Sequence, residues 1–371
     1  MKTRKKIIVL GATGSIGSSC IDIVRNNPGL FEITGLSAHR DKSGLEALSK
    51  EFAVSKSVLS GIEGEAALLA LIKDTDADIV LNGIAGASGL NPSIAALESG
   101  KDLALANKET IVMAGPLIRS LSIEKERLIL PVDSEHSAIF NLLNVYGKES
   151  ISEIILTASG GPFRAWDKQR LKTAKPIDAL KHPTWSMGAK ITIDSASLAN
   201  KGLEVIEACR LFDLKPEQVK VVVHPQSLVH SFIRTKDGVL YAQISKPDMR
   251  HPIFSALSWP EYCPNHIEPL KFDQICTMNF EPPRLTDFPL LNLAYKAAEL
   301  AGGYPIAYNA SNEIAVEAFL NEKISFMGLS EVTDRIMEQD WSNEPKSFEE
   351  VFVIDHKARI IAQSIIAGMN L

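Results

Sequence analysis

The chain has 371 residues, of which 45% are hydrophobic, and a formal net charge of −6 at pH 7. A chain of this length can bury at least one full core, and the length favours two or three domains. The acidic balance and the lack of a dense basic cluster with interleaved aromatic residues argue against a nucleic-acid binder, so we expect a small-molecule partner.

The cysteines and the apolar runs predict a cytoplasmic location. Four scattered cysteines without a CxxC motif are typical of reduced thiols: Cys20, Cys209, Cys263 and Cys276. The opening "MKTRKKIIVLGATGSIGSSC" has the basic start and the cysteine of a lipoprotein signal, but its apolar stretch is too short. Because no uncharged apolar run reaches about eighteen residues, we expect no membrane span.

The first predicted elements form the start of a βαβ unit. "KIIVLGATGSIGSSCIDIVRNN" predicts a short buried strand, a glycine turn and an amphipathic helix. The turn has glycines at Gly11, Gly14 and Gly17, where backbone N–H groups and the helix dipole can hold a pyrophosphate. This spacing departs from GxGxxG but suits a Rossmann variant. A tight turn without ligand is the alternative.

The turn after the second predicted strand, "FEITGLSAH", indicates which dinucleotide is bound. NAD-specific folds usually place an acid here, whereas a basic residue accommodates the 2′-phosphate of NADP. The turn reads "LSAHRDKS", in which Arg40, helped by His39 and Lys42, can pair with that phosphate while Asp41 opposes it. We therefore favour NADPH over NADH, and a solvated basic turn is the alternative.

The following segments repeat the rhythm of a doubly wound parallel sheet. "DADIVLNGIAGASGL", "KDLALANKETIVMAG" and "ERLILPVDSE" are apolar runs that alternate with helical stretches. We expect a Rossmann-like, NADPH-binding domain at 1–132 and a mixed α/β catalytic domain at 133–262, with strands such as "KVVVHPQSLVHSFI" and "GVLYAQIS". A linker at 263–284 and a C-terminal helical domain at 285–371 complete this α/β chain.

An acidic pair follows the last of those strands, in "PVDSEHSA" (131–138). If this stretch is extended, Asp133 and Glu135 lie on one face, and their repulsion requires a cation or a shared proton. Mg²⁺ and Mn²⁺ prefer such oxygen ligands. In "DSASLANKGLEVIEAC", Glu204 shares a helical face with Asn200 and Lys201, so it can complete the metal site while they face an anion. Solvated charges are the alternative.

Two irregular segments of the second domain have the composition of ligand-binding loops. "LTASGGPF" places Ser159 before two glycines, which allow the backbone to approach a ligand closely. "KHPTWSMGAK" contains His182, Trp185 and Gly188, a composition that suits a lid closing over substrate. A packed or surface histidine and a core tryptophan are the alternatives.

Together these motifs resemble the 1-deoxy-D-xylulose 5-phosphate reductoisomerase family over nearly the whole chain. The matching segments are "GATGSIG", "ANKE", "PVDSEH", "ASGGPF", "HPTWSMG", "DSASLANKGLE", "HPQS", "PDMR" and "NASNEIAVEAFL". The resemblance implies a cytoplasmic homodimer of non-mevalonate isoprenoid biosynthesis, with dimer-forming strands in the central domain. It also implies NADPH and Mg²⁺ or Mn²⁺ as cofactors, and 2-C-methyl-D-erythritol 4-phosphate as product.

The resemblance also implies roles for individual residues. The metal ligands would be Asp133, Glu135 and Glu204, and the catalytic set adds Lys108 and His182. Substrate contacts are expected from Lys108, Ser134, Glu135, Ser159, His182, Trp185, Ser195, Asn200, Lys201 and Glu204, of which Ser159, Ser195, Asn200 and Lys201 surround the phosphate. NADPH contacts are expected from Thr13, Gly14, Ser15, Ile16, His39, Arg40, Asp41, Asn107, Glu109 and Gly188. Thr184 stands where the family typically has Asn.

The implied reaction is a retro-aldol cleavage and aldol re-formation under metal Lewis acidity, followed by hydride reduction. Two other classes stay open from the residues alone. A semialdehyde dehydrogenase would share the first domain but needs an activated cysteine, and none of the four sits in such a motif. A non-catalytic NADP sensor would keep the glycine loop without needing three acids.

Overall fold

The computed structural model describes residues 4–185 and 187–369, and this backbone divides into two compact units. Unit 1 comprises Met1–Thr110, Ile118–Phe140 and Asp248–Leu270, and unit 2 comprises Ile111–Leu117, Asn141–Pro247 and Lys271–Leu371. Two helices carry residues of both units: α5 (Lys108–Glu124) and α6 (Ser134–Tyr146). The four segments expected from the sequence stay a prediction, because compactness alone does not delimit independently folding domains.

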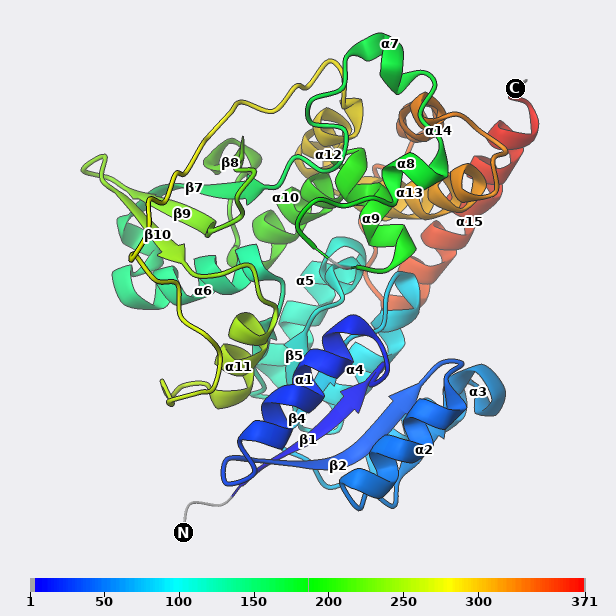
Figure 1. Ribbon diagram of the computed structural model, residues 1–371. Helices are drawn as coiled ribbons and strands as arrows, with labels where there is room; N and C mark the ends of the chain where they lie inside the picture. Colours follow the sequence, from blue (N-terminus) through cyan, green and yellow to red (C-terminus); the bar gives the residue numbers. More distant parts are fainter. Residues whose placement is uncertain (1–3, 186, 370–371) are drawn as a thin grey trace. The chain divides into compact units, whose positions relative to one another are not determined.

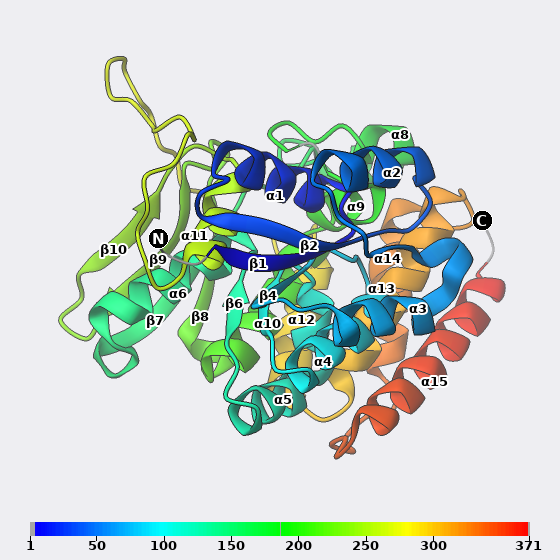
Figure 2. The same cartoon turned by 90° about the horizontal axis from the view of Figure 1, so that it is seen from below.

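Unit 1 is built on a parallel six-stranded sheet of order β3-β2-β1-β4-β5-β6. The strands are β1 (Lys5–Leu10), β2 (Phe31–Ala38), β3 (Ser57–Leu59), β4 (Ile79–Asn82), β5 (Asp102–Leu105) and β6 (Ile129–Pro131). The central strands are apolar without alternation because helices cover both faces of the sheet. Figure 2 shows α1 and α2 on one face and α3 and α4 on the other. The predicted doubly wound sheet is confirmed.

The helices of unit 1 follow the strands in the expected alternation. They are α1 (Ser15–Asn26), α2 (Lys42–Glu51), α3 (Ser60–Asp74) and α4 (Leu90–Glu98), and α11 (Arg250–Ser258) returns late in the chain to pack against α1. An ion pair holds this return, because Arg250 Nη1 lies 2.9 Å from Asp22 Oδ2 of α1. The "PDMR" segment thus joins the N-terminal unit from a distant part of the sequence.

Unit 2 contains a mixed four-stranded sheet of order β10-β9-β7-β8. Its strands are β7 (Ile151–Ala158), β8 (Val219–Val223), β9 (Val229–Thr235) and β10 (Leu240–Ile244). Strand β7 runs parallel to β8 and antiparallel to β9, which in turn pairs antiparallel with β10. The change from a parallel to a mixed sheet is therefore confirmed.

The rest of unit 2 is helical. Its helices are α7 (Lys168–Leu171), α8 (Pro176–Ala179), α9 (Ala189–Ala196), α10 (Ala199–Phe212), α12 (Pro289–Leu300), α13 (Tyr304–Leu320), α14 (Phe326–Met337) and α15 (Phe348–Ala367). Helix α13 contacts α9, α12, α14 and α15 and is buried over most of its length (Figure 1, orange). The predicted helical C-terminal part is confirmed. Within the described residues, no helix is long and apolar enough to span a bilayer.

One local prediction is wrong: Asp133 and Glu135 do not share the face of a strand. Strand β6 ends at Pro131, and α6 begins at Ser134. Asp133 Oδ1 accepts hydrogen bonds from the backbone N–H groups of Glu135 and His136, at 3.2 and 3.4 Å. An aspartate that satisfies the free N–H groups of a first turn favours a helix start over an extended chain.

The tightest backbone packing of unit 1 lies at Gly17. A Cβ atom there would lie 2.3 Å from the carbonyl oxygen of Gly11 and 2.5 Å from the Cα of Ala12. Both atoms are backbone and cannot rotate away. We expect Gly17→Ala to lower the free energy of unfolding by about 2 kcal/mol, measured by urea denaturation. Gly29→Ala is the control, since its Cβ meets open space; equal stability of the two variants would contradict this packing.

Candidate active site

The glycine loop of unit 1 leaves an open helix start. Gly14 precedes α1, no side chain caps it, and it is exposed together with Ser15. Gly11 has φ +75°, and its carbonyl oxygen accepts from Gly14 N at 3.0 Å, which shapes the turn. Helix N–H groups open to solvent fit an anionic group such as a pyrophosphate.

The basic turn after β2 has a different arrangement from the one expected. Asp41 is the N-cap of α2, and its carboxylate accepts from Gly44 N at 2.9 Å and from Ser43 Oγ at 3.2 Å. It therefore stabilises the first turn of its own helix. Arg40 and His39 are exposed, and His39 Nδ1 lies 3.3 Å from Ser60 Oγ at the start of α3.

Asn107 ties the loop after β4 to the start of α5. Its side-chain oxygen caps the helix by accepting from Thr110 N at 3.0 Å. Its Nδ2 donates to the carbonyls of Ile84 and Gly86, each at 2.8 Å, and to Glu109 Oε2 at 3.0 Å. Asn107 is 1% exposed, so it acts mainly as a support that fixes this edge of the sheet.

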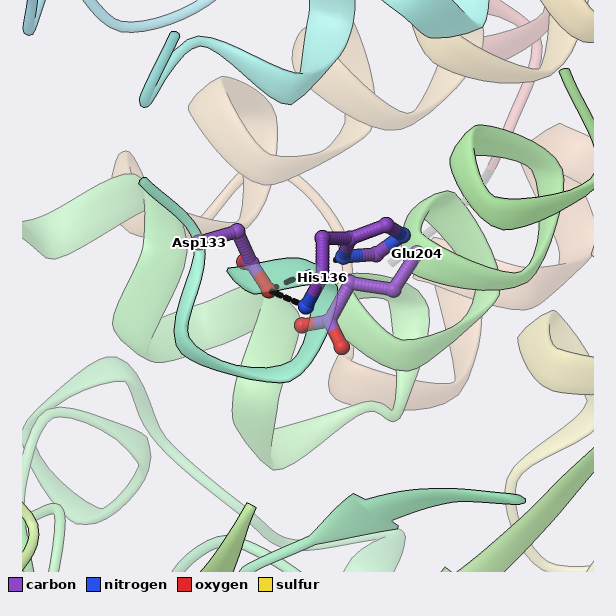
Figure 3. Close-up of side chains that lie close together, drawn as sticks. All are labelled: Asp133, His136 and Glu204. Atoms are coloured by element: carbon purple, nitrogen blue, oxygen red, sulfur yellow. Dashed lines mark hydrogen bonds and ion pairs between the residues drawn. The ribbon is translucent and has the colours of Figure 1, made fainter. Parts of the chain in front are cut away.

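Asp133 is held by a cation and an imidazole of the same unit. Lys108 Nζ lies 2.6 Å from Asp133 Oδ2, and His136 Nδ1 lies 3.0 Å from Asp133 Oδ1, a contact drawn in Figure 3. Glu135, on the first turn of α6, accepts from Ser134 Oγ and is half-buried. His136 is not among the candidates predicted from the sequence, although its i, i+3 spacing from Asp133 is the signal that identifies it.

In unit 2 the predicted face of α10 forms its own charged cluster. Glu204, labelled in Figure 3, accepts from Asn200 Nδ2 and from the ammonium of Lys201. Lys201 is 3% exposed and Glu204 is 1% exposed. Buried charges of this kind need a partner, so the lysine stabilises the carboxylate in this state. The helical spacing inferred from the sequence is confirmed.

Two serines and a histidine meet in unit 2. His182 Nε2 lies 3.1 Å from Ser159 Oγ and 3.1 Å from Ser195 Oγ. Ser159 follows β7, Ser195 belongs to α9, and His182 comes from the segment before α9. Gly161 keeps them close, because a Cβ there would lie 2.6 Å from the carbonyl oxygen of Ser195. These hydroxyl and imidazole groups can all donate to one oxyanion.

The backbone that follows His182 fixes the tautomer of its ring. Its Nδ1 accepts from the backbone N–H groups of Thr184 and Trp185, at 3.1 and 2.9 Å. The proton of the neutral ring therefore lies on Nε2 and points to the two serines. Burial lowers the pKa of His182 below its ordinary value of 6.5. Thr184 contributes here through its backbone, so its departure from the family pattern leaves this contact intact. Gly188 is exposed and precedes α9.

Comparison with family models accounts for most of the chain. A model described as 1-deoxy-D-xylulose 5-phosphate reductoisomerase matches residues 7–61 and 40–115. Models of the C-terminal domain of the same enzyme match 129–212 and 244–361. The chain belongs to the 1-deoxy-D-xylulose 5-phosphate reductoisomerase family. The enzyme class expected from the motifs, an oxidoreductase, is thereby confirmed.

Relatives of that name match at full length. The protein of Treponema denticola is 48% identical over 97% of this chain and 96% of its own. The protein of Treponema pallidum is 44% identical over 98% of each chain, and that of Prosthecochloris aestuarii is 46% identical over 97% of this chain and 99% of its own.

Solved structures of the family share the whole fold. A DOX-P reductoisomerase in complex with NADPH, fosmidomycin and magnesium has a TM-score of 0.91 at 38% identity, and covers 98% of each chain. The enzyme of Zymomonas mobilis in complex with NADPH has a TM-score of 0.92 at 37% identity, covering 99% of this chain and all of its own. The predicted fold class is therefore confirmed.

The lowered pKa of His182 generates a prediction for pH titration. The folded protein binds this proton more weakly than the unfolded chain, so the stability contributed by the neutral ring is present above pH 6.5 and is lost as the pH falls through the folded pKa. In ¹⁵N histidine spectra, the His182 signal is assigned as the one that is absent from His182→Gln. We expect this signal to titrate below pH 6.5 and to show an unprotonated Nδ1 at pH 7. A proton on Nδ1 would contradict the tautomer.

Proposed function

We propose that this protein converts 1-deoxy-D-xylulose 5-phosphate to 2-C-methyl-D-erythritol 4-phosphate, using NADPH and a divalent cation. Family membership supports the reaction. The cluster of Ser159, His182 and Ser195 is the observation that supports a phosphorylated substrate. Hydroxyl and imidazole groups gathered in this way are hydrogen-bond donors that suit a phosphate. The test is to mix the purified protein with the pentulose phosphate, NADPH and Mg²⁺ and to follow the loss of NADPH absorbance. No loss in wild type would refute the proposal.

The first unit supplies all but one of the residues proposed to hold NADPH, the exception being Gly188 of unit 2. The open start of α1 fits the pyrophosphate, and the exposed side chains of Arg40 and His39 suit the 2′-phosphate. The full proposed set is Thr13, Gly14, Ser15, Ile16, His39, Arg40, Asp41, Asn107, Glu109 and Gly188. When bound, the cofactor supplies the hydride, and these side chains orient it.

The carboxylates of Asp133, Glu135 and Glu204 are proposed to hold Mg²⁺ or Mn²⁺. Hard divalent cations prefer such a donor set, and the cation supplies Lewis acidity toward the carbonyl and hydroxyl oxygens of the substrate. Asp133 and Glu204 each already bind a lysine, Lys108 and Lys201 respectively. A divalent cation competes with these ammonium groups for the carboxylates. We infer that the displaced lysines then serve the substrate.

Under this proposal, both lysines have a substrate role. Lys108, with Ser134, stabilises negative charge that develops on the reacting oxygens, a task that an ammonium group in a site of low water content performs well. Lys201 joins Asn200, Ser159 and Ser195 around the phosphate. His182 donates from Nε2, and Trp185 of the same segment covers the substrate. Binding energy from the phosphate then helps to orient the reacting carbons.

Two of the four thiols count against the competing dehydrogenase class. Burial raises the pKa of both Cys20 and Cys209 to about 12. Neither is therefore a thiolate near neutral pH, and a thiol of this kind is a poor nucleophile. A sensor without catalysis is tested by the turnover assay itself.

We also propose that the protein is a cytoplasmic homodimer. Strand β10 is at one end of its sheet and, among the described residues, pairs with β9 alone. Its end residues Leu240 and Ile244 are 43% and 44% exposed, and an apolar edge strand is suited to pairing with a second copy. Light scattering after size exclusion measures the mass. A monomer at micromolar concentration would contradict the dimer.

Glu135→Gln tests the metal ligands. The variant keeps the shape of the side chain and loses its charge, so it should bind Mg²⁺ more weakly and lose most turnover while it still binds NADPH. Isothermal titration with Mg²⁺ and the turnover assay measure both effects. Glu98→Gln, an exposed acid on α4, is the matched control. Unchanged metal affinity and activity in Glu135→Gln would remove Glu135 from the site.

Arg40→Ala tests the choice of dinucleotide. We expect it to weaken NADPH binding by about tenfold or more, because a charge-assisted contact to the 2′-phosphate is lost. NADH, which lacks that phosphate, should bind almost as before. Fluorescence titration with each cofactor measures the ratio, and Lys50→Ala on α2 serves as a control for loss of surface charge. An equal loss for both cofactors would show that Arg40 does not read the phosphate.

A further inference from the structure

A second buried carboxylate in unit 2 lies beside the serine cluster and has no role so far. Asp194, in α9, directly precedes Ser195 and is 1% exposed. Its Oδ1 accepts from Asn312 Nδ2 at 2.8 Å, and its Oδ2 lies 2.9 Å from Lys190 Nζ. Asn312 belongs to α13 and is fully buried. The contact therefore joins α9 to a helix of the C-terminal part of the chain.

The hydrogen bond between Asn312 and Asp194 depends on distance and direction, whereas apolar packing does not. A buried carboxylate is costly unless its oxygens have partners. Lys190 belongs to α9 itself and moves with Asp194, so the amide of Asn312 is the partner that holds α9 in place. A small shift of α9 relative to α13 would lengthen the contact to Asn312. Apolar neighbours tolerate sliding more easily, whereas buried polar pairs specify one arrangement.

The part of the chain held in this way contains most of the proposed phosphate donors. Helix α9 ends at Ala196, and Leu198 then adopts a left-handed conformation with φ +59°, after which α10 begins at Ala199. This sharp corner places Ser195 on one side and Asn200 and Lys201 on the other. We call residues 194–201 the α9–α10 corner. The position of the corner determines how far Ser195 lies from Ser159.

We infer that Asn312 and Asp194 are positioning residues for recognition of the substrate phosphate. They act through the α9–α10 corner and do not touch the substrate themselves. The inference rests on the proposed function and extends it to the "NASNEIAVEAFL" segment, whose buried asparagines have no direct part in the site.

The same helix offers a matched control. Asn309 lies three residues before Asn312 on α13 and is also fully buried. Its Nδ2 donates to Glu313 Oε1, at 3.1 Å, within the same helix. Replacement of Asn309 removes a buried amide of the same type and size whose hydrogen bond stays within α13 and does not reach α9. A general loss of stability should therefore affect variants at both asparagines, whereas a loss of phosphate recognition should appear only in the variant at Asn312.

Asn312→Leu and Asn309→Leu should both melt at lower temperature than wild type. Only Asn312→Leu should raise the KM for 1-deoxy-D-xylulose 5-phosphate, by about tenfold, which corresponds to one lost hydrogen bond to a charged group. The KM for NADPH should stay the same in both. An equal KM for the sugar phosphate in the two variants would overturn the inference.

A second pair of substitutions, which exchanges the amide and the carboxylate of Asn312 and Asp194, tests the inference if Asn312→Leu does not fold. Asn312→Asp places two carboxylates against each other and should raise the KM. Adding Asp194→Asn removes this repulsion, so the double variant should have a lower KM than Asn312→Asp, while the loss of the carboxylate beside Lys190 keeps it above that of wild type. A KM equal to that of Asn312→Asp would overturn the pairing. An inactive wild type would refute the proposed function and this inference with it, whereas an active wild type with unaltered variants would refute this inference alone.

Discussion

Buried carboxylates, and the lysines that neutralise them, are the constraint on which the candidate site depends. Asp133 lies beside Lys108, Glu204 beside Lys201 and Asp194 beside Lys190. Leaving any of these acids unpaired inside the protein would cost several kcal/mol. The Lys108–Asp133 pair joins the start of α5 to the turn before α6, whereas the other two pairs lie within α10 and α9 and fix only their own side chains. Two of the acids proposed to hold a divalent cation, Asp133 and Glu204, are balanced by ammonium groups in this structure.

The sheets and helices could be predicted because their signals are local. Runs such as "KIIVL" and "DIVLN" are apolar without alternation, which is what a strand covered on both faces requires. The glycine turn and the helix after it belong to the same short segment. The change to strands of a mixed sheet after residue 151, and the helical pattern after residue 285, were likewise readable from periodicity.

The errors and omissions concern side chains that bond to the backbone or to distant residues. Asp133 and Asp41 were interpreted by their charge, but both accept hydrogen bonds from the N–H groups of a following helix turn. The residues after β6 could have continued as a strand or begun a helix. The position at which the strand ends decides between these two conformations. Asn312 contacts a partner 118 residues away, so no spacing rule identifies that contact. Sequence reasoning selected the chemical groups, whereas tertiary packing selected their partners.

The fixed tautomer of His182 has a consequence for the chemistry of recognition. An imidazole whose Nδ1 accepts two backbone N–H groups can offer its Nε2 proton without being charged. The strength of this donor then changes little across the neutral range, where a free histidine would gain or lose its charge. Under the proposed function, the phosphate monoester of the substrate itself changes charge at about pH 6, in its second ionisation. The pH dependence of this one contact then follows the charge of the ligand rather than the charge of His182.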